Sequence, residues 1–404
     1  MEDCHWVECS DCGLLQRLPE PKAGHDRQCG RCGRSFGVGL TQGQTARALA
    51  LTAMILFMLA NVAPFMGLNF SGRDQTIHLG SGVEGLAERQ GLLPVALFVL
   101  AIAILAPLGR MLALGTVLIR LQRNGRPKWL AHLLRFSEAM RPWAMLDVFL
   151  VGALVSLTKL NDLASVSVGI GFYTLGALVI VLALLDVSVD RGELWHSIEP
   201  APASQHPPAG DWRGCLECGL VQEPSERCSR CHARLHKRKP DSLQRATALV
   251  LAGFILYLPA NLYPVLTVIS LGRGHPATIM QGVIELMDGT DWPLAVIVFT
   301  ASVAVPLLKL FGLSLLIVST HLQAKGRLSD RTKLYRAIEF VGRWSTVDVI
   351  VAALLTALVT LGNLAHVEPG VGVLAFAGVV FVTMLATGLF DPRLLWDEAG
   401  ANDG

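Results

Sequence analysis

Hydrophobic and polar residues follow one another along this chain in long blocks. A helix needs about 20 apolar residues to cross a bilayer. In the first half, blocks of this kind lie at 48–70, 92–121, 143–163 and 168–189. In the second half they lie at 243–271, 292–322, 344–366 and 370–390. The pattern predicts an all-α polytopic membrane protein with eight transmembrane helices, in two sets of four.

The second block of each set, 92–121 and 292–322, is longer than one bilayer thickness, so it is expected to tilt or kink. Each block also contains a proline, Pro107 or Pro306, which removes one backbone hydrogen bond from a helix. Two interpretations stay open: a packed kink, or a hinge that exposes a polar spot inside the membrane.

The two sets of four are copies of one plan. Ala60-Asn61-Val62-Ala63-Pro64 returns 200 residues later as Ala260-Asn261-Leu262-Tyr263-Pro264. Trp143 with Asp147 matches Trp344 with Asp348. Four spans is an even number, so both copies have the same orientation in the membrane. The cleft between them is the expected place for a substrate.

Eight of the nine cysteines form CxxC pairs, and two pairs precede each set of spans. The pairs are Cys9 with Cys12, Cys29 with Cys32, Cys215 with Cys218, and Cys228 with Cys231. Two CxxC loops complete a tetrahedral site, and four thiolates leave no coordination position open. The spacing therefore predicts two structural Zn2+ sites. Iron in a rubredoxin-like centre and disulfide or redox pairing are the alternatives, and zinc is preferred because no other redox residues accompany the cysteines.

A glycine follows the second cysteine of three pairs, at Gly13, Gly33 and Gly219. The fourth pair has His232 at this place, so its turn is expected to differ. The predicted units are an N-terminal zinc ribbon at 1–41, a first transmembrane bundle at 42–196 and a linker at 197–210. A second zinc ribbon at 211–240, a second bundle at 241–398 and a tail at 399–404 follow.

Composition supports lipid as the solvent, because 52% of the residues are hydrophobic and only 16% are charged. A net charge of +2 argues against a nucleic-acid partner. Lys and Arg gather at 120–135, 227–239 and 325–343, whereas the loops at 71–91 and 272–291 hold few. The positive-inside rule places both termini and both ribbons in the cytoplasm. Apolar residues at helical spacing in 128–140 and 332–341 indicate short surface helices or cytoplasmic extensions of the following spans.

Ionisable residues inside the spans are candidate functional residues, because a lone charge in the bilayer is costly. Lys309, Asp348 and Thr383 all fall in the cytoplasmic half of their spans, within reach of one another if the helices tilt. They form either a buried structural ion pair or a polar centre that relays a proton or gates a path. The corresponding first-half pair is Arg110 and Asp147.

Two further charges, Lys159 and Asp162, lie at the extracytoplasmic end of the third span. Snorkelling and helix capping explain them adequately, and a functional role is the alternative. The chain has no Gly-x-x-x-x-Gly-Lys-Ser/Thr phosphate loop, no His-Glu-x-x-His and no Gly-x-Ser-x-Gly elbow. We therefore expect that this protein is not an enzyme.

Three features of the chain carry a resemblance to a known family: the paired CxxC ribbons ahead of four spans, the Ala-Asn-x-x-Pro motif of each half, and the closing Phe390-Asp391-Pro392-Arg393-Leu394. With these features the chain resembles the paraquat-inducible protein A family, which includes LetA-type intermembrane transport proteins. The resemblance covers the chain from Cys9 to Trp396. It implies a multi-pass protein of the bacterial inner membrane that works with an MCE-domain partner, which forms a periplasmic tunnel for lipids.

The leading hypothesis from this resemblance is an inner-membrane subunit that loads or extracts phospholipid or another lipid. Its preferred functional centre consists of Lys309, Asp348 and Thr383. The first half departs at Leu182, which replaces the threonine, and at Asp190-Arg191-Gly192, which replaces Asp391-Pro392-Arg393. The alternatives are a rubredoxin-like electron-transfer membrane protein, a scaffold that only anchors the MCE partner, and a small-molecule exporter.

Overall fold

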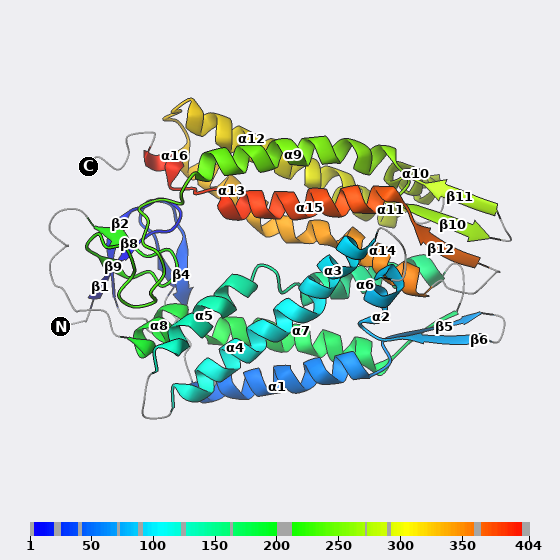
Figure 1. Ribbon diagram of the computed structural model, residues 1–404, viewed down its shortest axis with the longest axis horizontal. Coiled ribbons are helices and arrows are strands. Elements are labelled where there is room, and N and C mark those ends of the chain that lie inside the picture. Colours follow the sequence, from blue (N-terminus) through cyan, green and yellow to red (C-terminus); the bar gives the residue numbers. More distant parts are fainter. Residues whose placement is uncertain are drawn as a thin grey trace.

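The computed structural model describes residues 4–19, 26–38, 43–70, 73–87, 92–122, 127–161, 165–199, 212–270, 273–288, 292–358 and 365–397. The helices of the two halves form two bundles that lie side by side (Figure 1). The first contains α1 (Gly43–Val62), α3 (Leu93–Leu100), α4 (Ala106–Arg120), α6 (Leu146–Asn161) and α7 (Ile170–Ser188). The second contains α9 (Ser242–Leu262), α11 (Trp292–Phe299), α12 (Val305–His321), α14 (Val347–Leu358) and α15 (Val371–Leu389).

Six helical segments in the described part of the chain are long and apolar enough to cross a membrane. They are Gly43–Val62, Leu93–Arg120, Ile170–Ser188, Ser242–Leu262, Thr300–His321 and Val371–Leu389. The predicted third and seventh spans correspond to shorter helices, α6 with 16 residues and α14 with 12. The structure thus supports six of the eight predicted spans by length, and the count of eight stays a prediction.

The two longest segments each contain a π-helical turn just before their proline, η1 (Ala101–Leu105) and η2 (Thr300–Ala304). In the first half the Ala106 N–H donates to the Ala101 carbonyl, five residues back. Pro107 has no N–H for the next carbonyl, that of Ile102, which instead accepts from the Met145 N–H at 3.4 Å. Both segments therefore depart from regular α-helical hydrogen bonding before their proline, and in the first half this contact joins the π-helical turn to the start of the third span.

Two three-stranded antiparallel sheets lie at the end of the molecule opposite the cysteine ribbons (Figure 1), with strand orders β6-β5-β7 and β11-β10-β12. Their strands are β5 (Met66–Phe70), β6 (Arg73–Ile77), β7 (Ser165–Val168), β10 (Leu266–Ser270), β11 (Arg273–Ala277) and β12 (Ala365–Pro369). The all-α prediction is wrong in this respect. Hydropathy merged β5 and β10 with the preceding spans, yet α1 and α9 end at Val62 and Leu262, because a residue before proline disfavours the helical conformation.

The remaining elements are short and most lie at the two ends of the bundles. The sheet end carries α2 (Ser81–Ala87) and α10 (Ile279–Asp288), and the ribbon end carries α5 (Trp129–Met140), α8 (Arg191–Ile198), α13 (Leu328–Gly342) and α16 (Leu394–Asp397). The ribbons contain β1 (Cys4–Glu8), β2 (Leu15–Pro19), β3 (Asp26–Gln28), β4 (Ser35–Val38), β8 (Arg213–Gly214) and β9 (Val221–Gln222). The helices α5 and α13 confirm the two short helices expected after the second and sixth spans.

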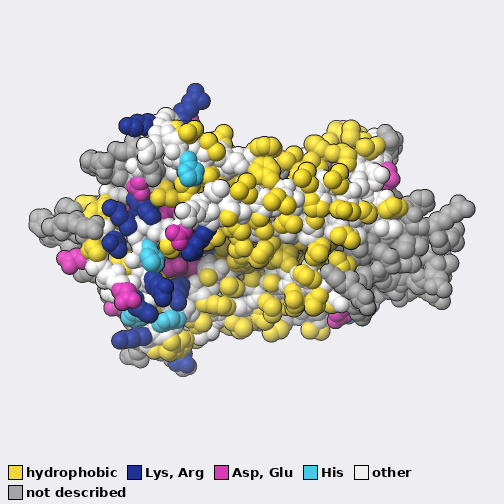
Figure 2. Space-filling model, turned by 45° about the horizontal axis from the view of Figure 1, so that its top comes forward, with side chains coloured by type: hydrophobic (Ala, Val, Ile, Leu, Met, Phe, Trp, Pro, Cys, Tyr) yellow, Lys and Arg dark blue, Asp and Glu magenta, His cyan; other side chains and the backbone are white. Residues whose placement is uncertain are grey.

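Hydrophobic side chains cover the middle of the surface, and charged side chains gather at the ribbon end (Figure 2). Ile55, Leu258 and Leu308 are each more than 60% exposed, which would be costly in water but is ordinary for a face in contact with lipid. The surface therefore matches the membrane class that the composition predicts.

A glycine pair at the start of α7 and of α15 closes each bundle at the sheet end. Gly171 N–H donates to the Pro64 carbonyl at 2.9 Å, and Gly372 N–H donates to the Pro264 carbonyl at 3.1 Å. A Cβ added at Gly171 would lie 2.9 Å from the carbonyl oxygens of both Ala63 and Pro64. Only glycine lets the helix approach this backbone so closely.

We predict that Gly171→Ala lowers the free energy of unfolding by about 1–3 kcal/mol, because the helix start must shift away from backbone atoms that cannot yield. Gly176→Ala is the matched control in the same helix, since an added Cβ there meets nothing within 4 Å. The measurement is the thermal unfolding midpoint of both variants in detergent. Equal midpoints for the two variants would contradict the close approach.

Candidate functional site

Each ribbon brings four cysteine sulfurs together. They are Cys9, Cys12, Cys29 and Cys32 in the first ribbon, and Cys215, Cys218, Cys228 and Cys231 in the second. All eight are buried, and within each group the Sγ atoms lie within 4.8 Å of one another. The closest pairs are separated by 3.5–3.6 Å, far beyond the bond length of about 2.05 Å in a disulfide. Tetrahedral thiolate coordination of zinc gives S···S distances of about 3.8 Å, so each group fits one metal ion.

All four CxxC loops have the same turn. Gly13, Gly33 and Gly219 have φ values of 70°, 67° and 72°, and His232 has a φ of 56°. The His232 N–H donates to the Cys228 carbonyl at 3.0 Å, as the Gly13 N–H does to Cys9 at 2.8 Å. The expectation of a different fourth turn is wrong, because histidine tolerates the left-handed conformation at a cost of about 1–2 kcal/mol.

An arginine from the second bundle contacts the first metal cluster. Arg336 in α13 donates through Nη2 to the Cys32 Sγ at 3.2 Å and through Nε to the Asp11 carboxylate at 2.6 Å. Arg34 of the ribbon also pairs with Asp11. Four thiolates around a divalent ion carry a net charge of −2, and a guanidinium donor offsets part of it.

The ribbons pack crosswise on the two bundles. The first ribbon shares a buried cluster with Leu310, Tyr335 and Trp396 of the second half, and Arg31 lies 5.3 Å from the centre of the Trp396 ring. The second ribbon shares a buried cluster with Leu114 and Trp195 of the first half. Each four-cysteine ribbon therefore packs on the bundle of the other repeat.

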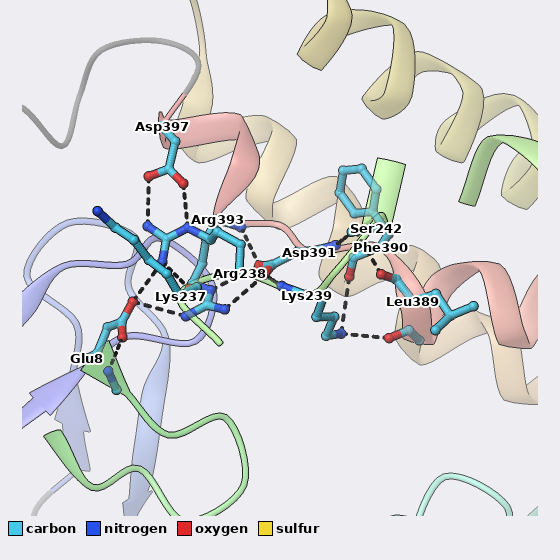
Figure 3. Close-up of polar contacts among 12 residues, drawn as sticks. Glu8, Lys237, Arg238, Lys239, Ser242, Leu389, Phe390, Asp391, Arg393 and Asp397 are labelled. Carbon is cyan, nitrogen blue, oxygen red and sulfur yellow. Dashed lines mark hydrogen bonds and ion pairs between the residues drawn. The ribbon is translucent and has the colours of Figure 1, made fainter. Parts of the chain in front are cut away.

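A buried charge cluster, shown in Figure 3, connects the first ribbon to the end of α15. Arg393 is 1% exposed and donates to Glu8 of β1 at 3.0 Å and to Asp391 at 3.0 and 2.9 Å. Glu8 also accepts from Arg238 Nη1 at 3.1 Å and from the Gly214 N–H of the second ribbon at 2.9 Å. Burial alone would raise the pKa of Asp391, but the Arg393 guanidinium holds this pKa below its usual range.

In the first half, the carboxylate that matches Asp391 pairs with an arginine from the first ribbon. Asp190 matches Asp391 by position, and Gly192 stands where the second half has Arg393. Arg27 of the first ribbon donates to Asp190 at 3.0 Å, and both side chains are buried. The departure noted at Asp190-Arg191-Gly192 is thus compensated by a ribbon arginine.

Lys309 is fully buried between three helical elements. It is 1% exposed, and its Nζ donates to the Thr383 hydroxyl at 2.8 Å and to the Gly342 carbonyl at 3.3 Å. No ion pair joins it to a carboxylate in the described part of the chain. The predicted contact with Asp348 is not formed, because Asp348 lines a separate cavity of about 110 Å³ with Ser302 and Thr278.

In the first half the predicted pair is also rearranged. Arg110 forms its ion pair with Asp186 of α7, whereas Asp147 forms no ion pair among the described residues and lines, with Arg110 and Asp186, a larger cavity between the two bundles. Asp186 is an ionisable residue inside an apolar span, so the search for ionisable residues inside the spans could have found it. The side chain of Lys159 and the whole of Asp162 lie outside the described residues.

A cavity of about 750 Å³ lies between the two bundles, near the ribbon end. Its lining combines six arginines, four carboxylates and an apolar wall. The charged lining residues are Arg34, Arg110, Arg141, Arg191, Arg336, Arg343, Glu138, Asp147, Asp186 and Glu339. The wall includes Met111, Val179, Leu182, Phe340 and Met384. The combination suits an amphiphilic molecule with a charged end and an apolar body.

The fold and these sites define a multi-pass membrane protein made of two repeats, each with a four-cysteine cluster that could hold a metal ion. The chain belongs to the paraquat-inducible protein A family, whose model matches residues 44–199 and 243–400. The two matched ranges correspond to the two bundles. Membership therefore confirms both the resemblance and the duplication seen in the sequence.

Relatives of this chain are named as transport proteins. The intermembrane transport protein PqiA of Escherichia coli (strain K12) is 35% identical, over 97% of this chain and 95% of the relative. The lipophilic envelope-spanning tunnel protein A of the same strain is 31% identical, over 97% and 91%. A probable intermembrane transport protein of Haemophilus influenzae is 26% identical, over 96% and 95%. No solved structure matches.

We predict two metal ions per chain in the purified protein. Cys12→Ser and Cys218→Ser are each expected to retain one ion, because the two clusters are separate and each needs all four thiolates. Elemental analysis gives the count, and Cys4→Ser, which lies outside the CxxC pairs, is the control with two ions. A full metal content in Cys12→Ser would contradict the assignment of that cluster.

The crosswise packing makes a second prediction for these variants. Loss of the first metal in Cys12→Ser should increase amide hydrogen exchange in α13 of the second bundle more than in α5 of the first. Cys218→Ser should do the reverse, because the second ribbon packs on the first bundle. Exchange that rises in the bundle of the same repeat would show that the ribbons do not cross.

Glu8→Ala is expected to destabilise the docked first ribbon by about 3–5 kcal/mol, since it leaves the buried Arg393 and Arg238 with fewer carboxylates. The measurement is limited proteolysis of the ribbon together with the thermal unfolding midpoint. Glu223→Ala changes an exposed carboxylate of the other ribbon and serves as the control. A Glu8→Ala protein as stable as this control would contradict the role of the cluster.

Proposed function

We propose that this protein is the inner-membrane component of an intermembrane lipid transport system, which loads lipid into, or extracts it from, a periplasmic tunnel formed by an MCE-domain partner. The printed names of its relatives, an intermembrane transport protein and a lipophilic envelope-spanning tunnel protein, support transport between membranes. The cavity between the bundles is the single observation that carries the proposal. Its volume of about 750 Å³ and its mixed lining suit the head of a lipid and the first part of its acyl chains.

The topology supports eight crossings with the ribbons on the cytoplasmic side. The short helices α6 and α14 lie in the chain between the ribbon-end helices α5 and α13 and the strands β7 and β12, which pair in sheets at the opposite end. The chain therefore passes from one end of the molecule to the other in each of these segments, although neither helix has the length of the other spans. The charged ribbon end fits the cytoplasm by the positive-inside rule. The cysteine clusters then hold zinc, which supports the fold without entering the transport step.

The hydrogen bond between Lys309 and Thr383 is the proposed contact that changes during transport. The ammonium of Lys309 has three N–H donors and two neutral acceptors, which come from α15 and from the end of α13. A change in its hydrogen bonding alters how α12, α13 and α15 pack together. Asp348 lines a small apolar cavity nearer the sheets and is the candidate group for proton coupling.

We predict that Lys309→Met and Asp348→Asn fold and insert normally but lose most lipid transfer, by about tenfold or more, which corresponds to one lost charged interaction. Lys333→Met, at an exposed position of α13, is the matched control. The assay follows labelled phospholipid from proteoliposomes to acceptor vesicles through the purified partner, with and without a pH gradient.

Partner capture is measured on the same variants. Inactive variants that still bind the partner would count against a role as a passive scaffold. Full transfer by both Lys309→Met and Asp348→Asn would remove this centre from the proposed function.

A further inference from the structure

Most charges that line the cavity between the bundles already have partners within the protein. Arg110 pairs with Asp186, Arg191 pairs with Glu138 at 2.8 Å, and Arg34 and Arg336 both bind Asp11. These groups shape the cavity and neutralise one another. They leave little charge to recognise a ligand.

Four lining side chains remain available. Arg343, Glu339 and Asp147 form no ion pair with any residue in the described ranges, and Arg141 lies 3.9 Å from Asp186, which Arg110 already holds. Glu339 and Arg343 are four residues apart along continuous helix, from α13 into η3 (Arg343–Thr346). Opposite charges at this spacing commonly pair. Here both line the cavity instead.

The available charges are two guanidinium groups and two carboxylates. A ligand with only negative charge would lie beside the carboxylates of Glu339 and Asp147, and like charges in one cavity repel each other. A ligand that carries both a phosphate and an ammonium satisfies both kinds of group. Arginine binds phosphate oxygens through two parallel N–H donors, and a carboxylate accepts hydrogen bonds from a primary ammonium.

We propose that this cavity selects phospholipids with a zwitterionic headgroup bearing a primary amine. Arg343 and Arg141 bind the phosphodiester, and Glu339, with Asp147, binds the ammonium. The proposal rests on the lipid transport function above and names the substrate of that site. Arg141 and Arg343 each lie within two residues of the matched Trp143 and Trp344, so the headgroup bridges the two repeats.

The apolar side of the cavity accounts for the rest of the ligand. Leu182 stands where the second half has Thr383, and it lines the cavity together with Val179 and Met384. This leucine gives the acyl chains an apolar wall next to the charged groups. The divergence of the first half is therefore explained as part of the lipid site.

The test is native mass spectrometry of the purified full chain in detergent with three added lipids: phosphatidylethanolamine, phosphatidylcholine and phosphatidylglycerol. The wild-type protein should bind phosphatidylethanolamine most tightly, because only its amine is both cationic and a three-fold donor. Glu339→Gln should weaken phosphatidylethanolamine about tenfold and leave phosphatidylglycerol equal or tighter. Arg343→Gln should weaken all three lipids, and Lys333→Gln should change none.

Two results would overturn the headgroup site: tighter binding of phosphatidylglycerol than of phosphatidylethanolamine by the wild-type protein, or an equal effect of Glu339→Gln on both. Soluble phosphoethanolamine separates headgroup recognition from a lipid site, since it should compete only at much higher concentration. A protein that binds phosphatidylethanolamine selectively but transfers no lipid would sink the transport function alone. Transfer without headgroup preference, unchanged in Glu339→Gln, would sink the headgroup site alone.

Discussion

The burial of Arg393 is the constraint on which the ribbon end of this protein depends. A guanidinium that is 1% exposed costs several kcal/mol unless carboxylates surround it. Asp391 supplies one carboxylate locally, and Glu8 supplies the other from β1, almost 400 residues away in the chain (Figure 3). Glu8 also accepts hydrogen bonds from Arg238 and from the Gly214 N–H, so the carboxylate that pairs with Arg393 also joins the first ribbon to the second.

Docked ribbons in turn define the cavity between the bundles. Arg34 belongs to the first ribbon and Arg336 to the second bundle, and both bind Asp11, which lies between two metal-ligating cysteines. Both arginines also line the cavity. A metal ion held by these cysteines would therefore fix the position of two cavity side chains without lining the cavity itself.

Cysteine spacing and apolar blocks were enough to predict the two four-cysteine clusters, the duplication and most of the helices. The crosswise packing of the ribbons could not be predicted, because in a duplicated sequence each ribbon has the same pattern of partners in either half. The sheets were missed because β5 and β10 are as apolar as the spans before them. The partner of Lys309 depended on helix rotation, which puts Asp348 on the side of α14 that faces another cavity. Length and hydropathy carry no information about that rotation.

The two repeats place different chemistry at matched positions. The first holds Arg110 in an ion pair with Asp186, and arginine keeps its proton under all physiological conditions. The second holds Lys309 against two neutral acceptors, and lysine is the cation that can exchange its proton. A fixed charge suits a wall of the cavity, whereas an exchangeable one suits a step that must reverse in each cycle. Under the proposed function, duplication followed by divergence thus separated the binding of lipid from the energy input. On that proposal, this division would account for the different cations at the matched positions Arg110 and Lys309.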